Sequence, residues 1–318
     1  MSHGSVCLLT ARLLGGMTPR PRLCLLENVP GLADKDKATG RSNLHAVKGA
    51  FASYGFFFVH KTFNATDTGI PCNRPRLYMA AVAGLAAEEE KDALTDRILG
   101  SLDAMLSELS LDPRPPSEFL LDSYMPDEYT PDDMISDWMP QLRGRQERSA
   151  TKKAPLPKKK RKKGKKNKRE LTWAACPRKA DKPRYEADLK GNPWFELLTV
   201  REKDVLLLNL CQHHYPGPED GVVTLMTSVK FSRLVRGAIP CQVPNALFWM
   251  VAQRRLQTGA EALMLQGVDL VDIPSFGIGS HPERFLQDLA GNAFCVYQFM
   301  VWLLACLPHV PRGPVEAA

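Results

Sequence analysis

The sequence has none of the cysteine, histidine or apolar patterns that would identify a metalloprotein, a secreted protein or a membrane protein. No two of its eight cysteines form a C-x-x-C pair and their spacing is irregular. A disulfide framework and a zinc site are therefore not predicted, and a reducing compartment is expected. His213 and His214 are adjacent, but no further ligands follow at a metal-binding spacing, so we interpret them as part of a surface turn and predict no metal.

Long apolar runs are also missing. No stretch reaches the roughly 18 apolar residues that a membrane-spanning helix requires, and residues 294–307 come nearest. The N-terminus has no basic segment ahead of an apolar one, so no signal peptide and no membrane association are predicted. The apolar fraction of 44% is ordinary for a globular protein with its own core.

The net charge of +7 comes from one short segment. Residues 152–169 hold twelve of the 42 basic residues and no acidic residue, so the remainder of the chain has a net charge of −5. A segment so basic and so poor in aromatic residues is expected to be disordered, together with its flank from residue 143.

Residues 22–84 have the pattern of an α/β fold. The apolar run 23–26 ends at a turn, as expected of a buried parallel strand. Apolar residues recur at helical spacing over 43–54, and the runs 56–63 and 77–82 are strand-like. Short connections join these elements, as in sheets with helices on both faces.

The remaining elements are predicted from periodicity and capping signals. A helix is expected over 86–109, irregular structure over 112–140, and a helix over 199–210, where Thr199 and Glu202 have the spacing of a capping box. Residues 221–231 are expected to form a strand or hairpin. A short helix is predicted at 259–265, and a long, largely buried helix within 282–307.

Two short segments carry the residues most suited to catalysis. The first is Glu27-Asn28-Val29 followed by Pro30-Gly31-Leu32, and the second is Gly69-Ile70-Pro71-Cys72-Asn73-Arg74-Pro75-Arg76. Each adjoins a strand-like run, so one carboxylate and two guanidinium groups are expected to meet at one edge of the sheet. Alone, Glu27 would more readily be interpreted as capping a turn, and the two arginines as a solvated strand edge.

Together with two later segments, these motifs resemble the DNA cytosine-5 methyltransferase family. The later segments are Arg255-Leu256-Gln257-Thr258-Gly259 through Glu261 to Gly267, and Leu289-Ala290-Gly291-Asn292-Ala293-Phe294. Four weak motifs in the family's order make chance agreement unlikely. The resemblance implies an incomplete Rossmann-like sheet of the S-adenosylmethionine-dependent methyltransferase type, with an irregular, partly disordered insertion.

The resemblance also implies the catalytic residues. Glu27 would contact N3 of a flipped-out cytosine while a thiolate adds at C6, and Arg74 and Arg76 would stabilise charge near its O2 edge. The cofactor would be S-adenosyl-L-methionine, with Asn28, Gly291 and Asn292 as its binding residues. Cys72 stands where the family has glutamine, which removes one positioning hydrogen bond.

Two family elements are not found in their expected places. Neither the glycine loop that approaches the cofactor nor the Pro-Cys-Gln nucleophile precedes Glu27. Similar peptides occur downstream, Ile239-Pro240-Cys241-Gln242 and Phe276-Gly277-Ile278-Gly279, but their order is wrong, so Cys241 is not interpreted as the nucleophile. The chain is therefore expected to be inactive alone.

The basic run that follows Pro157 is typical of a nuclear-import signal. It consists of Lys158, Lys159, Lys160, Arg161, Lys162 and Lys163. It could bind an import receptor, contact DNA phosphates without sequence preference, or act as a solubilising linker. We predict a nuclear location.

These observations predict five regions. They are a partial α/β region at 1–84, a helix plus irregular segment at 85–142, a basic linker at 143–190, a recognition-region remnant at 191–250, and closing motifs with a C-terminal helix at 251–310. Three interpretations remain open: a fragment of an active enzyme, a non-catalytic nuclear DNA-binding or scaffolding protein, and a chain completed by a second methyltransferase chain. An RNA-acting relative of the family is an alternative to a DNA-acting one.

Overall fold

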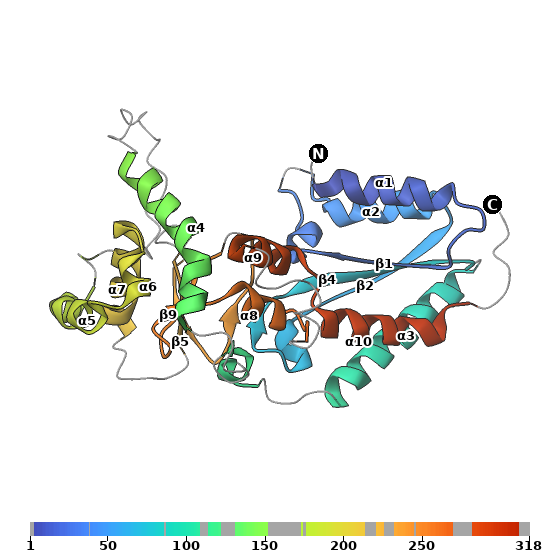
Figure 1. Cartoon of the computed structure of the whole chain (residues 1–318). Coiled ribbons are helices and arrows are strands. Elements are labelled where there is room, and N and C mark those ends of the chain that lie inside the picture. The colour runs from blue at the N-terminus through green and yellow to red at the C-terminus, as the bar shows by residue number, and fades with distance from the viewer. Residues whose placement is uncertain are drawn as a thin grey trace. The chain divides into compact units, whose positions relative to one another are not determined.

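The computed structural model describes most of the chain, which folds into two compact units (Figure 1). The described residues are 3–37, 39–85, 87–108, 114–121, 131–151, 173, 176–213, 221–225, 232–244, 246–269 and 282–311. Unit 1 comprises Met1–Pro113 and Phe294–Ala318, and unit 2 comprises Arg114–Ala293.

Unit 1 is built on a sheet of three long strands. They are β1 (Leu23–Asn28), β2 (Phe56–Phe63) and β4 (Arg76–Ala83), in the order β1-β4-β2, and a two-residue strand β3 (Cys72–Asn73) precedes β4. Both β1 and β2 run antiparallel to β4, so the prediction of a parallel strand at 23–26 is wrong. The predicted burial is wrong as well: every β1 residue is only half-buried, because β1 is at the edge of this sheet.

Helices α1 (His3–Gly15) and α2 (Asn43–Ala52) pack on one face of this sheet (Figure 1). Ser42 begins α2 by accepting a hydrogen bond from the backbone N–H of His45, and Gly55 turns the chain back into β2 with a φ of +75°. The core of this layer contains Cys7, Ala11, Leu44, Val47, Phe51, Phe56, Phe58, Leu77, Met79 and Ala81.

The opposite face is covered by α3 (Glu88–Glu108) and α10 (Val296–Cys306). Leu94, Ile98 and Leu102 lie on one side of α3, as their spacing predicts, and pack with Trp302 of α10 against the sheet. The Gln298 side chain of α10 donates a hydrogen bond to the Phe63 carbonyl, 3.1 Å away, at the end of β2. The chain's C-terminal segment therefore belongs to the same core as its N-terminal strands.

The prediction of one long buried helix within 282–307 is wrong in two respects. The segment forms α9 (Glu283–Asn292) and α10, separated by an extended turn at Ala293 and Cys295. One face of α10 is exposed. By length and composition alone, Glu283–His309 could cross a membrane, but α10 packs Val301 and Trp302 into the core of unit 1.

Unit 2 combines helices with a small antiparallel sheet. Its helices are α4 (Pro131–Thr151), α5 (Lys182–Leu189), α6 (Pro193–Glu196), α7 (Val200–His213), α8 (Gly259–Met264) and α9. The sheet has the order β6-β5-β8-β9, with β5 (Gly221–Thr224), β6 (Leu234–Arg236), β8 (Phe248–Met250) and β9 (Arg255–Leu256); the short β7 spans Ile239–Pro240. The capping box that begins α7 is confirmed, because Thr199 and Glu202 exchange backbone-to-side-chain hydrogen bonds.

Helix α4 corrects two predictions, the irregular structure over 112–140 and the disorder that begins at 143. It continues through Pro140 to Thr151 because tertiary contacts hold it: Trp138 is fully buried against Trp194, and Arg145 forms an ion pair with the buried Glu202. Residues 182–189 of the predicted basic linker are likewise helical, as α5. Residues 152–172 lie outside the described part of the chain.

Candidate active site

A short loop with many hydrogen bonds places Arg74 two residues before β4. Asn64 follows β2, and its side-chain oxygen accepts hydrogen bonds from the backbone N–H groups of Ala65 and Arg74, at 2.9 and 2.6 Å. Asp67 completes a capping box with Asn64. Gly69 then turns the chain at a φ of +78°, a left-handed conformation that favours glycine. The backbone that carries the arginines is thus fixed before any ligand binds.

The structure confirms that Glu27 and the two arginines converge. Arg76 Nε lies 2.7 Å from Glu27 Oε1, and the two side chains are 11% and 17% exposed. Arg74 is buried, and it is close enough to Glu27 to lower the pKa of that carboxyl group. Glu27 lies near the end of β1, Arg76 begins the neighbouring strand β4, and Arg74 precedes β4 by two residues.

Burial raises the pKa of Glu27 above its ordinary value, although the Arg76 and Arg74 guanidinium groups and the hydrogen bond from Arg76 lower it. Desolvation disfavours the carboxylate, and the cations only partly offset that effect. A carboxyl group with a raised pKa beside a cation is suited to exchange a proton with a ring nitrogen.

Two further residues belong to this cluster and were missed from the sequence. Tyr78 is directly opposite Glu27 across the β1–β4 pair, is fully buried and stacks on Phe63 at a centroid distance of 4.6 Å. Cys295 is the buried N-cap residue of α10. Alternation along β4 could have indicated Tyr78, which follows Arg76 by two residues and so shares its face.

Both of these side chains are held in their neutral forms. Burial raises the pKa of the Tyr78 phenol, and it also raises the pKa of the Cys295 thiol, although backbone N–H groups of α10 and the arginines act in the opposite direction. The thiolate, not the thiol, is the nucleophile. Cys295 therefore does not provide an activated nucleophile beside Glu27.

The predicted cofactor residues have structural contacts of their own. In unit 1, the side-chain oxygen of Asn28 accepts a hydrogen bond from the Val29 N–H at 2.9 Å. In unit 2, Asn292 donates to the Asp288 carbonyl at 2.8 Å. A Cβ built on Gly291 would lie 2.6 Å from the Val243 carbonyl carbon, so this glycine permits close backbone packing there. These contacts are structural, and the cofactor role of the three residues stays a prediction.

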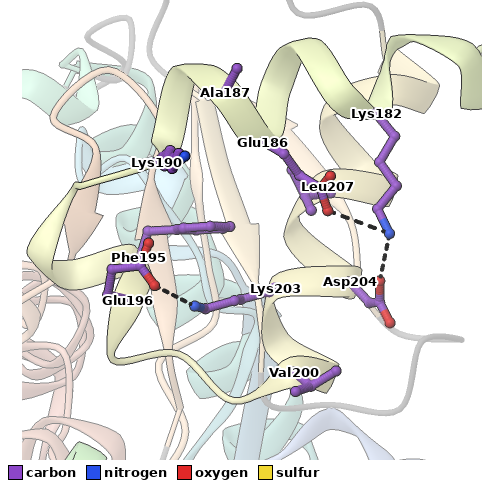
Figure 2. A pocket seen from close by; sticks show the side chains of 10 residues that line it. All are labelled: Lys182, Glu186, Ala187, Lys190, Phe195, Glu196, Val200, Lys203, Asp204 and Leu207. Carbon is purple, nitrogen blue, oxygen red and sulfur yellow. Dashed lines mark hydrogen bonds and ion pairs between the residues drawn. The ribbon is translucent and has the colours of Figure 1, made fainter.

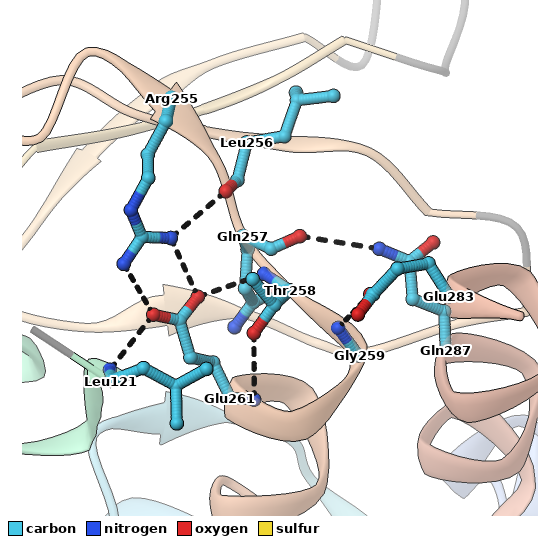
Figure 3. A network of polar contacts seen from close by, with 9 residues as sticks. All are labelled: Leu121, Arg255, Leu256, Gln257, Thr258, Gly259, Glu261, Glu283 and Gln287. Carbon is cyan, nitrogen blue, oxygen red and sulfur yellow. Dashed lines mark hydrogen bonds and ion pairs between the residues drawn. The ribbon is translucent and has the colours of Figure 1, made fainter. Parts of the chain in front are cut away.

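The third motif forms a buried polar network in unit 2 (Figure 3). Arg255 makes two hydrogen bonds to the Glu261 carboxylate, at 3.0 and 2.5 Å, and both side chains are almost fully buried. The same carboxylate accepts the backbone N–H groups of Leu121 and Thr258. The motif thus joins β9, α8 and the segment around Leu121, and the charges of Arg255 and Glu261 pair with each other.

The remaining predicted elements are divided between the two units and the residues outside the described part of the chain. Cys72 is buried in β3, whereas Cys241 belongs to unit 2. The import-like run and the glycine-rich peptide at 276–279 fall outside the described residues.

A surface pocket of ≈ 510 Å³ lies in unit 2 between α5, α6 and α7 (Figure 2). Its walls carry both signs of charge. Lys182 pairs with Glu186 and Asp204, and Lys203 pairs with Glu196 at 2.9 Å. Because these lysines are matched by acids, the pocket is not a strong site for a phosphate group.

The fold and the cluster together define an α/β protein with a partly buried acid–guanidinium site at one end of its sheet. The chain belongs to the C-5 cytosine-specific DNA methylase family, whose model matches residues 11–179, more than half of the sequence. Among solved structures, it is similar to the crystal structure of the S. pombe Dnmt2 methyltransferase. That match has 12% identity and a TM-score of 0.43, and covers 95% of this chain and 72% of that one. No curated protein matches the sequence.

Proposed function

We propose that this chain supplies the base-binding half of a DNA cytosine-5 methyltransferase site. Family membership supports methyl transfer to cytosine, and the observation that carries the finer proposal is the 2.7 Å Glu27–Arg76 pair beside the buried Arg74. A cytosine turned out of the helix offers an acceptor at N3 and another at O2. A carboxyl group with a raised pKa suits the first, and guanidinium groups suit the second.

The methyl group would come from S-adenosylmethionine, which family membership implies. Under the proposal, Glu27 exchanges a proton with N3, and the arginines hold the base and stabilise charge at O2. We further propose that the chain does not complete the reaction alone. Cys295, the thiol that interacts with Arg74 and Arg76, is buried and its pKa is raised, so it is a poor nucleophile.

The basic run Lys158–Lys163 is proposed to bind an import receptor and so to place the protein in the nucleus. Its cations would also add a non-specific contribution to DNA affinity, which would fall steeply with salt. The net charge of −5 on the rest of the chain supports assigning that contribution to the run.

Binding to duplex DNA with one mispaired cytosine tests the base-binding role, because a mispaired base is easier to extrude. Fluorescence anisotropy should show tighter binding to this duplex than to a fully paired one. Glu27→Gln and Arg76→Gln should reduce that preference by about tenfold each, the effect of losing one good polar base contact.

Lys61→Gln is the matched control, since Lys61 is a partly exposed cation of the same sheet, paired with Asp103 at 3.4 Å. It should leave the preference unchanged. Equal affinity for the two duplexes in the parent protein would exclude the proposed base site. Tighter binding to an unpaired cytosine in RNA would favour the RNA-acting alternative. If Glu27→Gln and Arg76→Gln both kept the parent protein's preference for the mispaired duplex, the result would favour a non-catalytic DNA-binding protein.

A further inference from the structure

A second pocket lies in unit 1, at the outer edge of its sheet. Strand β2 is the last in the order β1-β4-β2, and a pocket of ≈ 290 Å³ lies between this strand, α2 and α3. Two cations line the pocket, Lys48 of α2 and Lys91 of α3, and its apolar walls include Phe56, Phe57, Phe58 and Leu85. None of the described residues that line it is acidic, whereas acids line the pocket of unit 2.

Lys48 is a half-buried cation without a matching acid. Burial lowers the pKa of its ammonium group, and within the described part of the chain no carboxylate pairs with it. Neither α2 nor β2 contains an aspartate or a glutamate. A partly desolvated cation is stabilised by an anion that replaces the water it has lost, so Lys48 favours an anion in the pocket.

Neighbouring groups add to the positive potential around Lys48. Burial lowers the pKa of the His60 imidazole in β2, and the charge of Lys48 lowers it further. Arg20 lies beside Gly55, another residue of the pocket wall, because a Cβ built on this glycine would be 3.1 Å from Arg20 Nη1. Lys91 pairs with a residue whose side chain is 82% exposed, so water screens much of that pair.

The sequence on this side of unit 1 has a local excess of positive charge. Residues 37–66, which include α2 and β2, contain four basic residues and no acidic one, and residues 1–26 contain three and none. Lysines beside an edge strand can serve only to prevent pairing with other chains. That role requires a cation in water, whereas Lys48 is half-buried at a cavity.

The size and the apolar walls of the pocket limit its ligand to a small molecule. A volume of ≈ 290 Å³ is near the lower end of the range for ligand pockets, about 300–1,000 Å³. Phe57 and Leu85 are only partly buried, so their apolar surface is available to a ring. A phosphate monoester carries about two negative charges at neutral pH and several acceptor oxygens, which suits two ammonium groups better than one carboxylate does.

We propose that this pocket binds a small aromatic phosphate monoester, the chemistry that a mononucleotide carries. Lys48 and Lys91 hold the phosphate group, Arg20 adds a third cation at the Gly55 turn, and the ring lies on Phe57 and Leu85.

The pocket is separate from the Glu27 cluster and does not depend on the function proposed for it. Strand β4 begins at Arg76, in that cluster, and ends at Ala83, which pairs with Phe56 at the pocket. Seven residues of extended strand place the two sites roughly 23 Å apart.

Isothermal titration calorimetry of the full chain with phenyl phosphate, inorganic phosphate and phenol tests the proposal. Phenyl phosphate should bind once per chain and at least about tenfold more tightly than either fragment, because it buries a ring and pairs a charge together. Lys48→Gln should weaken its binding about tenfold, the effect of losing one charged hydrogen bond. Lys61→Gln is the control, since Lys61 is a partly exposed lysine of β2 that does not line the pocket, and it should change nothing.

A second pair of variants leaves Lys48 in place. Ala52 also lines the pocket, one helical turn after Lys48, so the carboxylate of Ala52→Glu would pair with Lys48 and compete with the phosphate. Ala52→Glu should therefore abolish binding of phenyl phosphate, whereas Ala52→Gln, of the same size and uncharged, should keep most of the affinity. Circular dichroism should show the same Tm for both variants.

Three results would overturn the proposal. The first is equal affinity for phenol and phenyl phosphate, and the second is binding that neither Lys48→Gln nor Ala52→Glu weakens. The third is displacement of phenyl phosphate by single-stranded DNA whose own binding is lost in Lys48→Gln, because the pocket would then be a contact for a nucleic-acid backbone.

Discussion

Replacing Arg76 by glutamine tests the most consequential contact in the molecule, its ion pair with Glu27. The substitution removes the positive charge and keeps much of the side chain's volume. It leaves the Glu27 carboxylate in a partly desolvated position with its strongest cation gone. Removing one partner of a buried pair costs about 3–5 kcal/mol. Because these side chains keep some exposure, the lower end, about 3 kcal/mol, is expected at neutral pH.

The loss of stability caused by Arg76→Gln should depend on pH, in a direction set by the titration of Glu27. Its pKa in the folded protein is above the ordinary value of 4.5, so the folded state binds the proton more tightly than the unfolded state. Stability therefore falls as pH rises from about 4.5 through the folded-state pKa. Arg76→Gln raises the folded-state pKa further, which widens this window. The deficit of the variant should thus be larger at pH 8 than at pH 5.

Urea unfolding at the two pH values, followed by circular dichroism, measures this difference. About 3 kcal/mol corresponds to a loss of about 10 °C in Tm for a unit of this size. Glu27→Gln combined with Arg76→Gln should recover part of the loss, because no unpaired charge remains. Lys61→Gln should change stability by less than about 0.5 kcal/mol, since its pair with Asp103 is exposed. Equal deficits at both pH values, or a double variant as unstable as the sum of the singles, would refute the reasoning.

Two further predictions concern substitutions in unit 2, and each has a matched control variant. Glu261→Gln removes a fully buried charge that holds two backbone N–H groups and an arginine, and should cost about 3–5 kcal/mol by urea unfolding. Glu118→Gln, from a half-exposed pair at 3.9 Å, should cost less than about 0.5 kcal/mol. Gly291→Ala should destabilise by about 1–3 kcal/mol, because the new methyl group meets the backbone before Pro244. Gly100→Ala, within α3 and with open space around it, should instead stabilise by about 0.5–1 kcal/mol in thermal unfolding. If Gly291→Ala proved neutral, the close packing assigned to this glycine would be wrong.

The sequence by itself determined the local elements of unit 1 and the composition of the candidate site. The predicted strands at 56–63 and 77–82 and the helix at 43–54 are present within two residues, because their apolar periodicity and turn residues agree with the packing. The convergence of Glu27 with Arg74 and Arg76 followed from their positions at strand ends. The apolar face of α3 was likewise predicted by the spacing of its leucine and isoleucine residues.

Only the tertiary structure decided how those elements pair and which of them remain uncovered. The direction of a strand in a sheet depends on the strand with which its backbone pairs. An apolar sequence such as that of β1 suits a central parallel strand and an antiparallel edge strand equally well, so the sequence does not distinguish them. Helix α4 has a weak helical pattern and an internal proline, and its burial of Trp138 outweighs both. Cys295 reaches the cluster because the chain returns, more than 200 residues after Tyr78, to pack α10 on the first sheet. Periodicity and capping are visible in a short window of sequence, whereas such long-range packing is not.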